Sequence, residues 1–269
     1  MTAPLFLLGA QRSGTTALAY ALSAAVAEQQ GGTFTVNGKL WYVLRRWLDA
    51  CDLRAQHLRA DEMLHALHRR PAQGVGAPEW LADVERALRT AAREVGEQRY
   101  RPDSGGMLAL CRAIASEVAG SRPWGDKYNE YLLDLPYLDR LFPDARWIVL
   151  SRHPAEVTAS MLAWTGDRPW NPTVVGQAES KWAAWNQCWL DFRVGVDPSR
   201  AVEVDYADLC SGAALDELAS FTGLDLSSLR SGFGRRRAAP KQATVGESAA
   251  EVWSQLRSTT WRASAAVVG

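Results

Sequence analysis

Short apolar runs alternate with longer helical segments along the chain. The run LFLL at residues 5–8 ends at Gly9, and residues 13–28 that follow are rich in Ala and Leu. This pattern predicts a buried strand, a tight loop and a helix in that order. A second run, TFTV with Asn37 at its end, predicts another strand at residues 33–37.

The rest of the chain continues this alternation after one long helical interruption. Residues 40–95 have a helical pattern that Pro and Gly break between residues 71 and 78. Further along, a helix precedes a strand predicted at 146–151, and a strand opening at AVEVDY (201–206) precedes a helix at 213–221. Strands that alternate with helices favour an α/β fold with a mainly parallel sheet flanked by helices.

The composition describes a globular chain with no overall electrostatic field. Its 269 residues are 47% hydrophobic, and 30 basic residues balance 30 acidic ones. A chain of this length can bury one substantial core, so we expect a single domain over residues 1–269, in which approximately residues 40–105 form an inserted helical cap. Because the net charge is zero, nucleic acid is not an expected partner, and any anion site must be local.

Cysteine usage and hydropathy bear on cellular location. The four cysteines are scattered without a C-x-x-C pair, which is neither a zinc signature nor a disulfide framework. The first apolar run is too short to cross a membrane, and no basic segment precedes it. We therefore expect a cytoplasmic protein with neither a signal peptide nor a membrane association.

The loop after the first strand, GAQRSGTT, is similar to the phosphate-binding loop G-x-x-x-x-G-K-[ST]. Gly9 and Gly14 have the required spacing, but Thr15 takes the place of the lysine, and Arg12 stands early in the loop. Glycines let backbone amides converge on an anion, and the following helix adds its N-terminal donors. The loop predicts a phosphate site, with an ordinary strand-to-helix turn as the alternative.

A second motif follows the strand predicted at 146–151. In SRHPAEVTAS, Arg152 comes directly after Ser151, the last residue of that predicted strand, and Ser160 follows eight residues later. Pro154 is well suited to begin a helix, which would carry Ser160 two turns along it. The motif therefore places Arg152 at the mouth of the sheet.

Together the two motifs resemble the sulfotransferase family that uses 3′-phosphoadenosine 5′-phosphosulfate (PAPS) as its sulfuryl donor. The resemblance implies a P-loop-like nucleotide-binding core, in which the first loop cradles the 5′-phosphosulfate and the later arginine and serine hold the 3′-phosphate. It also implies that adenosine 3′,5′-bisphosphate is the product and that no metal is required, so the loop can lack the lysine of an ATP-binding loop. The resemblance assigns the following residues to the nucleotide: Gln11, Arg12, Ser13, Gly14, Thr15, Thr16, Arg152, Ser160, Tyr206 and Arg236.

The resemblance covers residues 5–28 and 124 to about 226, and it leaves the cap unmatched. The run WGDKYNEYLLDLPYLDRLFPDARWIVLSRHP is similar to a family segment that holds a lysine, a helix and the arginine loop, and VEVDYADL is similar to a strand end before a helix. On this correspondence Lys127 falls where the family keeps a lysine near the transferred sulfuryl group. The alternative interpretations are a solvated surface lysine for Lys127 and a surface ion pair for Arg12.

The candidate general base is where the sequence departs from the family. Many members carry a glutamate near the end of the second strand, where this chain has Asn37 and Lys39; cytosolic members use a histidine after the lysine, where this chain has YNE at 128–130. We interpret Glu130 as the first candidate base and Asp126 as the second. Either carboxylate could instead complement a helix dipole.

Other conspicuous residues are interpreted as structural or peripheral. Trp182, Trp185 and Trp189 share one face of a predicted helix, which is typical of a core stripe. Loop aromatics are expected to border the acceptor or adenine pocket. These loop aromatics are Trp164 and Trp170. The basic turn Arg235–Arg237 either folds over the 3′-phosphate or is solvated. The cap histidines His57, His65 and His68 do not have the spacing of metal ligands.

The sequence thus predicts an enzyme that moves a sulfuryl group from PAPS to a hydroxyl or amine of a small-molecule acceptor, such as a specialised metabolite or a sugar. Arg12 and Lys127 would stabilise charge on the sulfuryl and leaving oxygens, and Glu130 would accept a proton from the acceptor. Two alternatives stay open. A P-loop kinase is disfavoured by Thr15 in the lysine position, and a nucleotide-binding module without catalysis would share the same loop.

Overall fold

The computed structural model describes residues 2–164, 171–231 and 245–258. The chain divides into two compact units. The first unit comprises Met1–Phe6, Ala19–Tyr128 and Tyr137–Ala145, and the second comprises Leu7–Leu18, Asn129–Pro136 and Arg146–Gly269.

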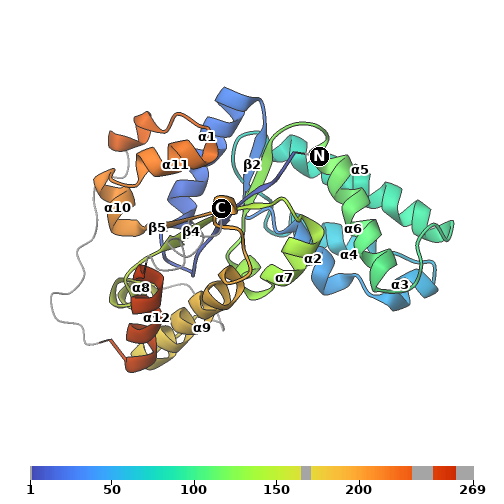
Figure 1. Ribbon diagram of the computed structural model, residues 1–269. Coiled ribbons are helices and arrows are strands. Elements are labelled where there is room, and N and C mark those ends of the chain that lie inside the picture. Colours follow the sequence, from blue (N-terminus) through green and yellow to red (C-terminus); the bar gives the residue numbers. More distant parts are fainter. Residues whose placement is uncertain (1, 165–170, 232–244, 259–269) are drawn as a thin grey trace. The chain divides into compact units, whose positions relative to one another are not determined.

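Five strands form one sheet in the order β2-β3-β1-β4-β5 (Figure 1). β2 pairs in parallel with β3, and β4 pairs in parallel with β5. The predicted α/β class, a mainly parallel sheet with flanking helices, is therefore confirmed. The strands are β1 (Leu5–Leu8), β2 (Thr33–Val36), β3 (Trp124–Lys127), β4 (Arg146–Ser151) and β5 (Ala201–Asp205).

The strand order makes the end of β1 a favoured ligand position. β1 is central, and the chain visits β2 and β3 on one side of it before it reaches β4 and β5 on the other. In open α/β sheets, ligands bind at the carboxyl ends of the strands where the order of connection reverses. The loop that follows β1 is the one with the phosphate-binding pattern.

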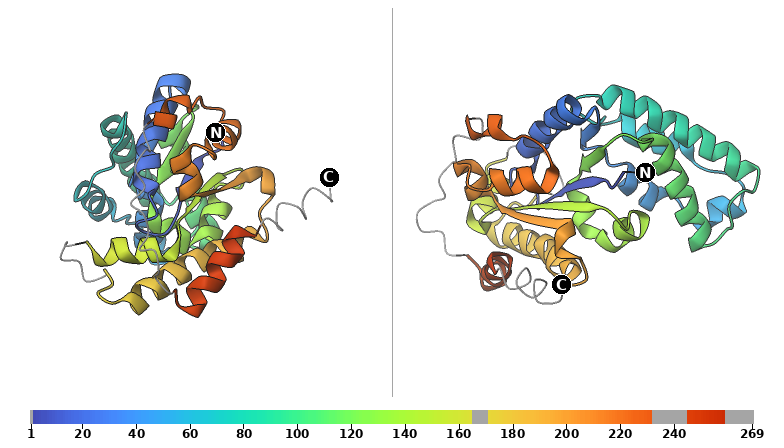
Figure 2. Two further views of the ribbon diagram at one scale, coloured as in Figure 1. Left: turned by 90° about the vertical axis from the view of Figure 1, so that its left-hand side faces the viewer. Right: turned by 45° about the horizontal axis from the view of Figure 1, so that its top comes forward.

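The first unit contains the helices expected for the cap. The Pro/Gly-containing interruption predicted at 71–78 separates two of them, α4 and α5, and α5 lies beside α6 (Figure 2). That this segment acts as a cap stays a prediction. The helices are α2 (Leu40–Trp47), α3 (Ala50–Arg54), α4 (Ala60–His68), α5 (Ala77–Gly96) and α6 (Ser104–Ala119).

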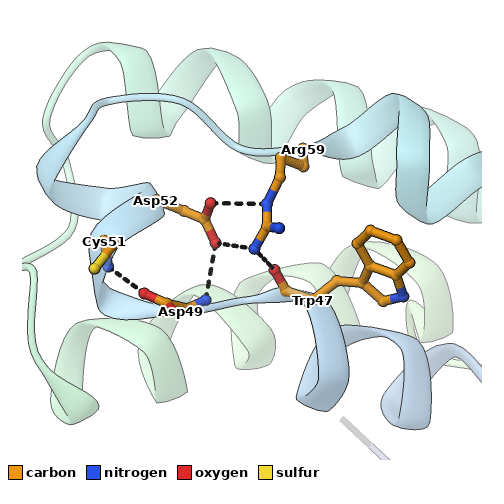
Figure 3. A network of polar contacts seen from close by, with 5 residues as sticks. All are labelled: Trp47, Asp49, Cys51, Asp52 and Arg59. Atoms are coloured by element: carbon orange, nitrogen blue, oxygen red, sulfur yellow. Dashed lines mark hydrogen bonds and ion pairs between the residues drawn. The ribbon is translucent and has the colours of Figure 1, made fainter.

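A polar network joins α3 to the ends of its neighbours in the first unit (Figure 3). Arg59 donates from Nε and Nη2 to the two carboxylate oxygens of Asp52, at 3.0 and 3.1 Å, and Nη2 also donates to the Trp47 carbonyl at 2.6 Å. Asp52 in turn accepts the Asp49 backbone N–H at 2.9 Å, which completes a capping box at the start of α3. The Asp52 carboxylate therefore stabilises the start of α3 and also holds the Arg59 guanidinium in place.

β3 is a strand that the hydrophobic pattern did not reveal. Its sequence, WGDK, has no apolar alternation, yet all four residues are buried. A Cβ on Gly125 would lie 2.3 Å from the Leu5 carbonyl oxygen and 2.5 Å from the Phe34 ring, so only glycine permits this close approach. Trp124 packs edge-on against Phe6 with ring centroids 5.9 Å apart.

The second unit is built around β4, β5 and the helices that follow them. The core stripe predicted for residues 182–189 is confirmed for Trp182 and Trp189, which are fully buried, whereas Trp185 is half-buried. In Figure 2, α12 runs beside α9. The helices are α8 (Pro154–Leu162), α9 (Val175–Arg193), α10 (Tyr206–Ser211), α11 (Leu215–Thr222) and α12 (Glu247–Arg257), with short 3-10 turns at Asn129–Leu133, Pro198–Arg200 and Ser227–Ser231.

Some predicted boundaries were wrong. The helix expected from residue 13 is α1 (Thr15–Gln30), which, like β1 and α7 (Leu135–Leu141), runs from one unit into the other. The strand expected through Tyr206 ends at Asp205, because the Asp205 carboxylate accepts the Ala207 N–H at 2.7 Å and so caps α10. The helix predicted at 213–221 is α11, and α10, which precedes it, was not predicted.

Candidate nucleotide-binding site

The loop between β1 and α1 is held in shape by Asn129. Its Nδ2 donates to the Gly9 carbonyl at 2.7 Å and to Thr15 Oγ1 at 3.3 Å. Thr15 is 3% exposed, so the hydroxyl in the position of a Walker lysine serves the loop itself. Arg12 has a φ of 70°, a left-handed conformation that costs free energy in a non-glycine residue and is often found at functional sites.

One aromatic ring supports both predicted nucleotide motifs. Gly14 has a φ of 95°, and a Cβ there would lie 2.5 Å from Cε2 of Tyr206. The guanidinium carbon of Arg152 lies 4.4 Å from the centroid of the same ring, within cation–π range. Burial is the largest cause that raises the pKa of Tyr206, and its hydrogen bond with Cys210 is the next. The phenol therefore keeps its proton at neutral pH.

The loop and the arginine motif meet through their side chains. Arg12 Nε donates to Ser160 Oγ at 3.0 Å, and Arg152 Nη1 donates to the Arg12 carbonyl at 3.3 Å. Arg152 Nε also donates to the carboxylate of buried Glu156 at 2.8 Å, which fixes the direction of the guanidinium. As predicted, α8 begins at Pro154 and carries Ser160 in its second half. The two motifs that the sequence assigns to the two ends of the nucleotide thus form one cluster.

Trp164 borders this cluster. The Arg12 guanidinium carbon lies 5.7 Å from the centroid of its ring. Whether the ring also contacts an adenine or an acceptor stays a prediction. Trp170 and the basic turn that contains Arg235, Arg236 and Arg237 lie outside the described residues.

Ser13 and Thr16 differ in exposure. Ser13 is fully buried, its N–H donates to the Ala10 carbonyl at 3.2 Å, and its hydroxyl has no hydrogen-bond partner among the described residues. Thr16 is exposed in the first turn of α1, where the helix leaves backbone N–H groups without intrahelical acceptors. Nucleotide contacts by Ser13 and Thr16 stay predictions.

Lys181 of α9 is a residue that the sequence reasoning missed. Its Nζ donates to Gln11 Oε1 in the loop at 3.0 Å and lies 5.3 Å from the centroid of the Trp185 ring. Burial lowers the pKa of Lys181, and the negative charge of Glu130 opposes that shift. The sequence feature that could have drawn attention to Lys181 is the rarity of lysine, because only four of the 30 basic residues are lysines.

Lys127 lies at the end of β3 in the first unit. It is 3% exposed, and its Nζ donates to Asn37 Oδ1 at 3.2 Å. The alternative of a solvated surface lysine is therefore wrong. Asn37, the residue directly after β2, has a φ of 61°, so its backbone is left-handed where its side chain accepts the hydrogen bond from Lys127.

Asp126, the second candidate base, has a structural role. Its carboxylate accepts the Gly38 N–H at 2.9 Å, the Lys39 N–H at 3.0 Å and the Thr35 hydroxyl at 2.8 Å, and it is 2% exposed. A carboxylate that accepts three internal hydrogen bonds is poorly placed to take a proton from an acceptor. Glu130, the first candidate, is half-buried in the 3-10 turn of the second unit, and its role as base stays a prediction.

The fold and the loop sequence define an α/β protein with a loop of the P-loop type after β1. The chain belongs to the sulfotransferase family: the model described as "Sulfotransferase family" matches residues 4–228. The family resemblance predicted from the two motifs is therefore confirmed. Among the residues that the structure describes, no group of three or more His, Cys, Asp or Glu side chains is arranged to hold a metal ion, and no helix is long and apolar enough for a membrane span.

One curated relative and two solved structures resemble this chain. Nodulation protein NoeE of Sinorhizobium fredii (strain NBRC 101917 / NGR234) is 32% identical over 165 residues, which cover 60% of this chain but 31% of that protein. The Sulfotransferase Domain from the Curacin Biosynthetic Pathway has a TM-score of 0.57 and 15% identity, with 95% of this chain and 98% of that one covered. The Sulfotransferase Domain from the Synechococcus PCC 7002 Olefin Synthase has a TM-score of 0.53 and 18% identity, with 96% and 95% covered. At these identities the two structures show a shared fold.

Proposed function

We propose that this protein transfers a sulfuryl group from PAPS to a hydroxyl or amine of a small-molecule acceptor. The observation that carries the proposal is the cluster of Arg12, Arg152 and Ser160 beside the loop after β1, with the Arg12–Ser160 hydrogen bond at 3.0 Å. Such a cluster suits a nucleotide with anionic groups at both its 5′ and 3′ positions, because guanidinium groups bind phosphate and sulfate oxygens with charge-assisted hydrogen bonds.

The loop chemistry supports a sulfuryl donor over a nucleoside triphosphate. A kinase of this type uses a lysine on the outer phosphates and a hydroxyl on magnesium. Here Thr15 occupies the lysine position and is buried against Asn129, whereas Thr16 keeps the hydroxyl position, so the lysine is the group that this loop lacks. A donor without a γ-phosphate does not require that lysine. A P-loop kinase is therefore the weaker alternative.

The proposed chemistry is an in-line displacement at sulfur. The acceptor oxygen or nitrogen forms a bond to sulfur as the bond from sulfur to the phosphate oxygen breaks, and adenosine 3′,5′-bisphosphate leaves with that electron pair. Arg12, and Lys127 by its resemblance to the family lysine, would stabilise the negative charge on the nonbridging and leaving oxygens. Glu130 would take the acceptor proton, a contribution of about 10²- to 10⁴-fold in rate.

The residues around Arg152 suit recognition of the 3′-phosphate. The ion pair with Glu156 and the ring of Tyr206 hold the guanidinium in place before any ligand arrives. Preorganised groups lose less conformational entropy on binding. We also propose a cytoplasmic location, which the four free cysteines support.

The test begins with nucleotide binding. Adenosine 3′,5′-bisphosphate should raise the melting temperature more than adenosine 5′-phosphate or ATP with magnesium, and a ligand at a hundred times its Kd stabilises by about 2.7 kcal/mol. Transfer from radiolabelled PAPS to a panel of specialised metabolites and sugars then tests catalysis. A larger shift with ATP and magnesium would favour a kinase, whereas binding of the bisphosphate without any transfer would favour a nucleotide-binding module.

A further inference from the structure

Lys181 contacts the donor loop but has no role in the chemistry described above. It projects from α9, and Gln11, which it contacts, lies in the loop three residues before Gly14. The next residue of the loop, Arg12, instead donates a hydrogen bond to Ser160 of α8. The loop therefore has a cation from α9 at Gln11 and its own guanidinium directed toward α8.

The surroundings of Lys181 favour an anionic partner. The ammonium is half-buried, and its hydrogen bond to Gln11 is made to a neutral amide oxygen. A charge that is partly removed from water is stabilised far better by an anion than by a neutral acceptor. The Trp185 ring lies one helical turn along α9, with its centroid 5.3 Å from the ammonium, and the charge of Glu130 favours the protonated form of Lys181.

We infer that Lys181 is a donor-binding residue whose ammonium contacts the 5′ phosphate–sulfuryl end of the donor, where it supplies from α9 the cation that the loop lacks at Thr15. When the nucleotide binds, a nonbridging oxygen replaces the amide oxygen of Gln11 as the acceptor of the Lys181 hydrogen bond. The inference rests on the proposed function, because it requires a nucleotide with an anionic 5′ end.

The experiment compares two nucleotides and a small set of variants by titration calorimetry. Lys181→Met should weaken adenosine 5′-phosphate and adenosine 3′,5′-bisphosphate by the same factor, about 10- to 100-fold, because both carry the 5′-phosphate. Lys181→Arg keeps the positive charge and should lose less. Gln187→Met on the same helix is the matched control, since the Gln187 side chain bonds only one turn away, to Asp191; it should leave both affinities unchanged.

A second variant separates ligand contact from positioning. If Lys181 served only to hold Gln11, then Gln11→Leu would reproduce the loss seen in Lys181→Met. We expect Lys181→Met, when it is added to Gln11→Leu, still to weaken both nucleotides by about 10-fold or more, because the ammonium contacts the ligand directly. No further loss from Lys181→Met in the Gln11→Leu background, or unchanged affinities in Lys181→Met alone, would overturn the inference. If Lys181→Met fails to fold, Lys181→Gln removes the charge with a polar side chain and gives the same comparison.

The wild-type protein distinguishes failure of this inference from failure of the proposed function. Absence of binding by wild-type protein to both nucleotides would reject the proposed function and, with it, the role of Lys181. Binding by wild-type protein that Lys181→Met leaves intact would reject only the role of Lys181.

Discussion

Gly14→Ala is the substitution for which the geometry of the donor loop makes the sharpest prediction. The backbone at Gly14 has a φ of 95°, and the added methyl carbon would lie 2.5 and 2.7 Å from two carbons of the Tyr206 ring. A left-handed backbone costs a non-glycine residue about 1–2 kcal/mol, and overpacking against a fixed ring costs about 1–3 kcal/mol. We therefore expect a loss of about 2–5 kcal/mol in the free energy of unfolding, or an altered loop.

Stability and nucleotide binding should be measured on the same samples. A loss of 1 kcal/mol lowers the melting temperature of a domain of this size by about 2–4 °C, so Gly14→Ala should melt about 4–20 °C lower. If the loop rearranges instead, the melting temperature falls less and affinity for adenosine 3′,5′-bisphosphate falls more. Gly176→Ala is the matched control in α9, where an added Cβ meets no atom within 4 Å, and it should be neutral or stabilising.

Removal of the ring tests the steric part of this reasoning. In the double variant Gly14→Ala with Tyr206→Ala, the clash is absent while the backbone cost remains, so the two losses should be less than additive by about 1–3 kcal/mol. Gly14→Ala with wild-type melting temperature and wild-type affinity would refute the account of the loop. Full additivity would show that the ring does not limit the loop.

Three further substitutions test other parts of the molecule. Arg152→Ala should weaken adenosine 3′,5′-bisphosphate by about 30- to 150-fold in calorimetry and leave adenosine 5′-phosphate nearly unchanged; equal losses would place the 3′-phosphate elsewhere. Asp52→Asn, in the network of Figure 3, should lower the free energy of unfolding measured in urea by about 1–3 kcal/mol. Glu85→Gln, in an exposed ion pair, is the control and should change it by less than about 0.5 kcal/mol. Similar losses in the two variants would contradict the role of the network. Burial raises the pKa of Cys111 to about 11, so the unfolded chain releases the thiol proton first, and stability should fall as the pH rises above about 9. Cys111→Ala should remove that part of the alkaline loss in urea titrations and exposed Cys51→Ala should keep it; an unchanged profile in Cys111→Ala would refute the assignment.

Local patterns were enough to locate the two motifs that are predicted to bind the nucleotide. The apolar runs that became β1, β2 and β4 were predicted at nearly their observed bounds, because strands buried on both faces are continuous apolar segments. Pro154 set the start of α8, and with it the position of Ser160 relative to Arg152. The spacing of Gly9 and Gly14 indicated the loop. These are features whose physical causes lie within a few residues of the position concerned.

Contacts between distant parts of the sequence decided the features that local patterns did not predict. β3 is buried by packing against Leu5 and Phe34, although WGDK has no strand pattern. Asp126 was a candidate base until its carboxylate was found to accept hydrogen bonds from the backbone after β2. Lys181 reaches Gln11 across 170 residues of chain. The sequence by itself determined where the donor loop, Arg12 and Arg152 stand along the chain, because those positions depend on local backbone chemistry. Only the tertiary structure decided the partners of Asp126 and Lys181, because those partners depend on the pairing and packing of elements far apart in the chain.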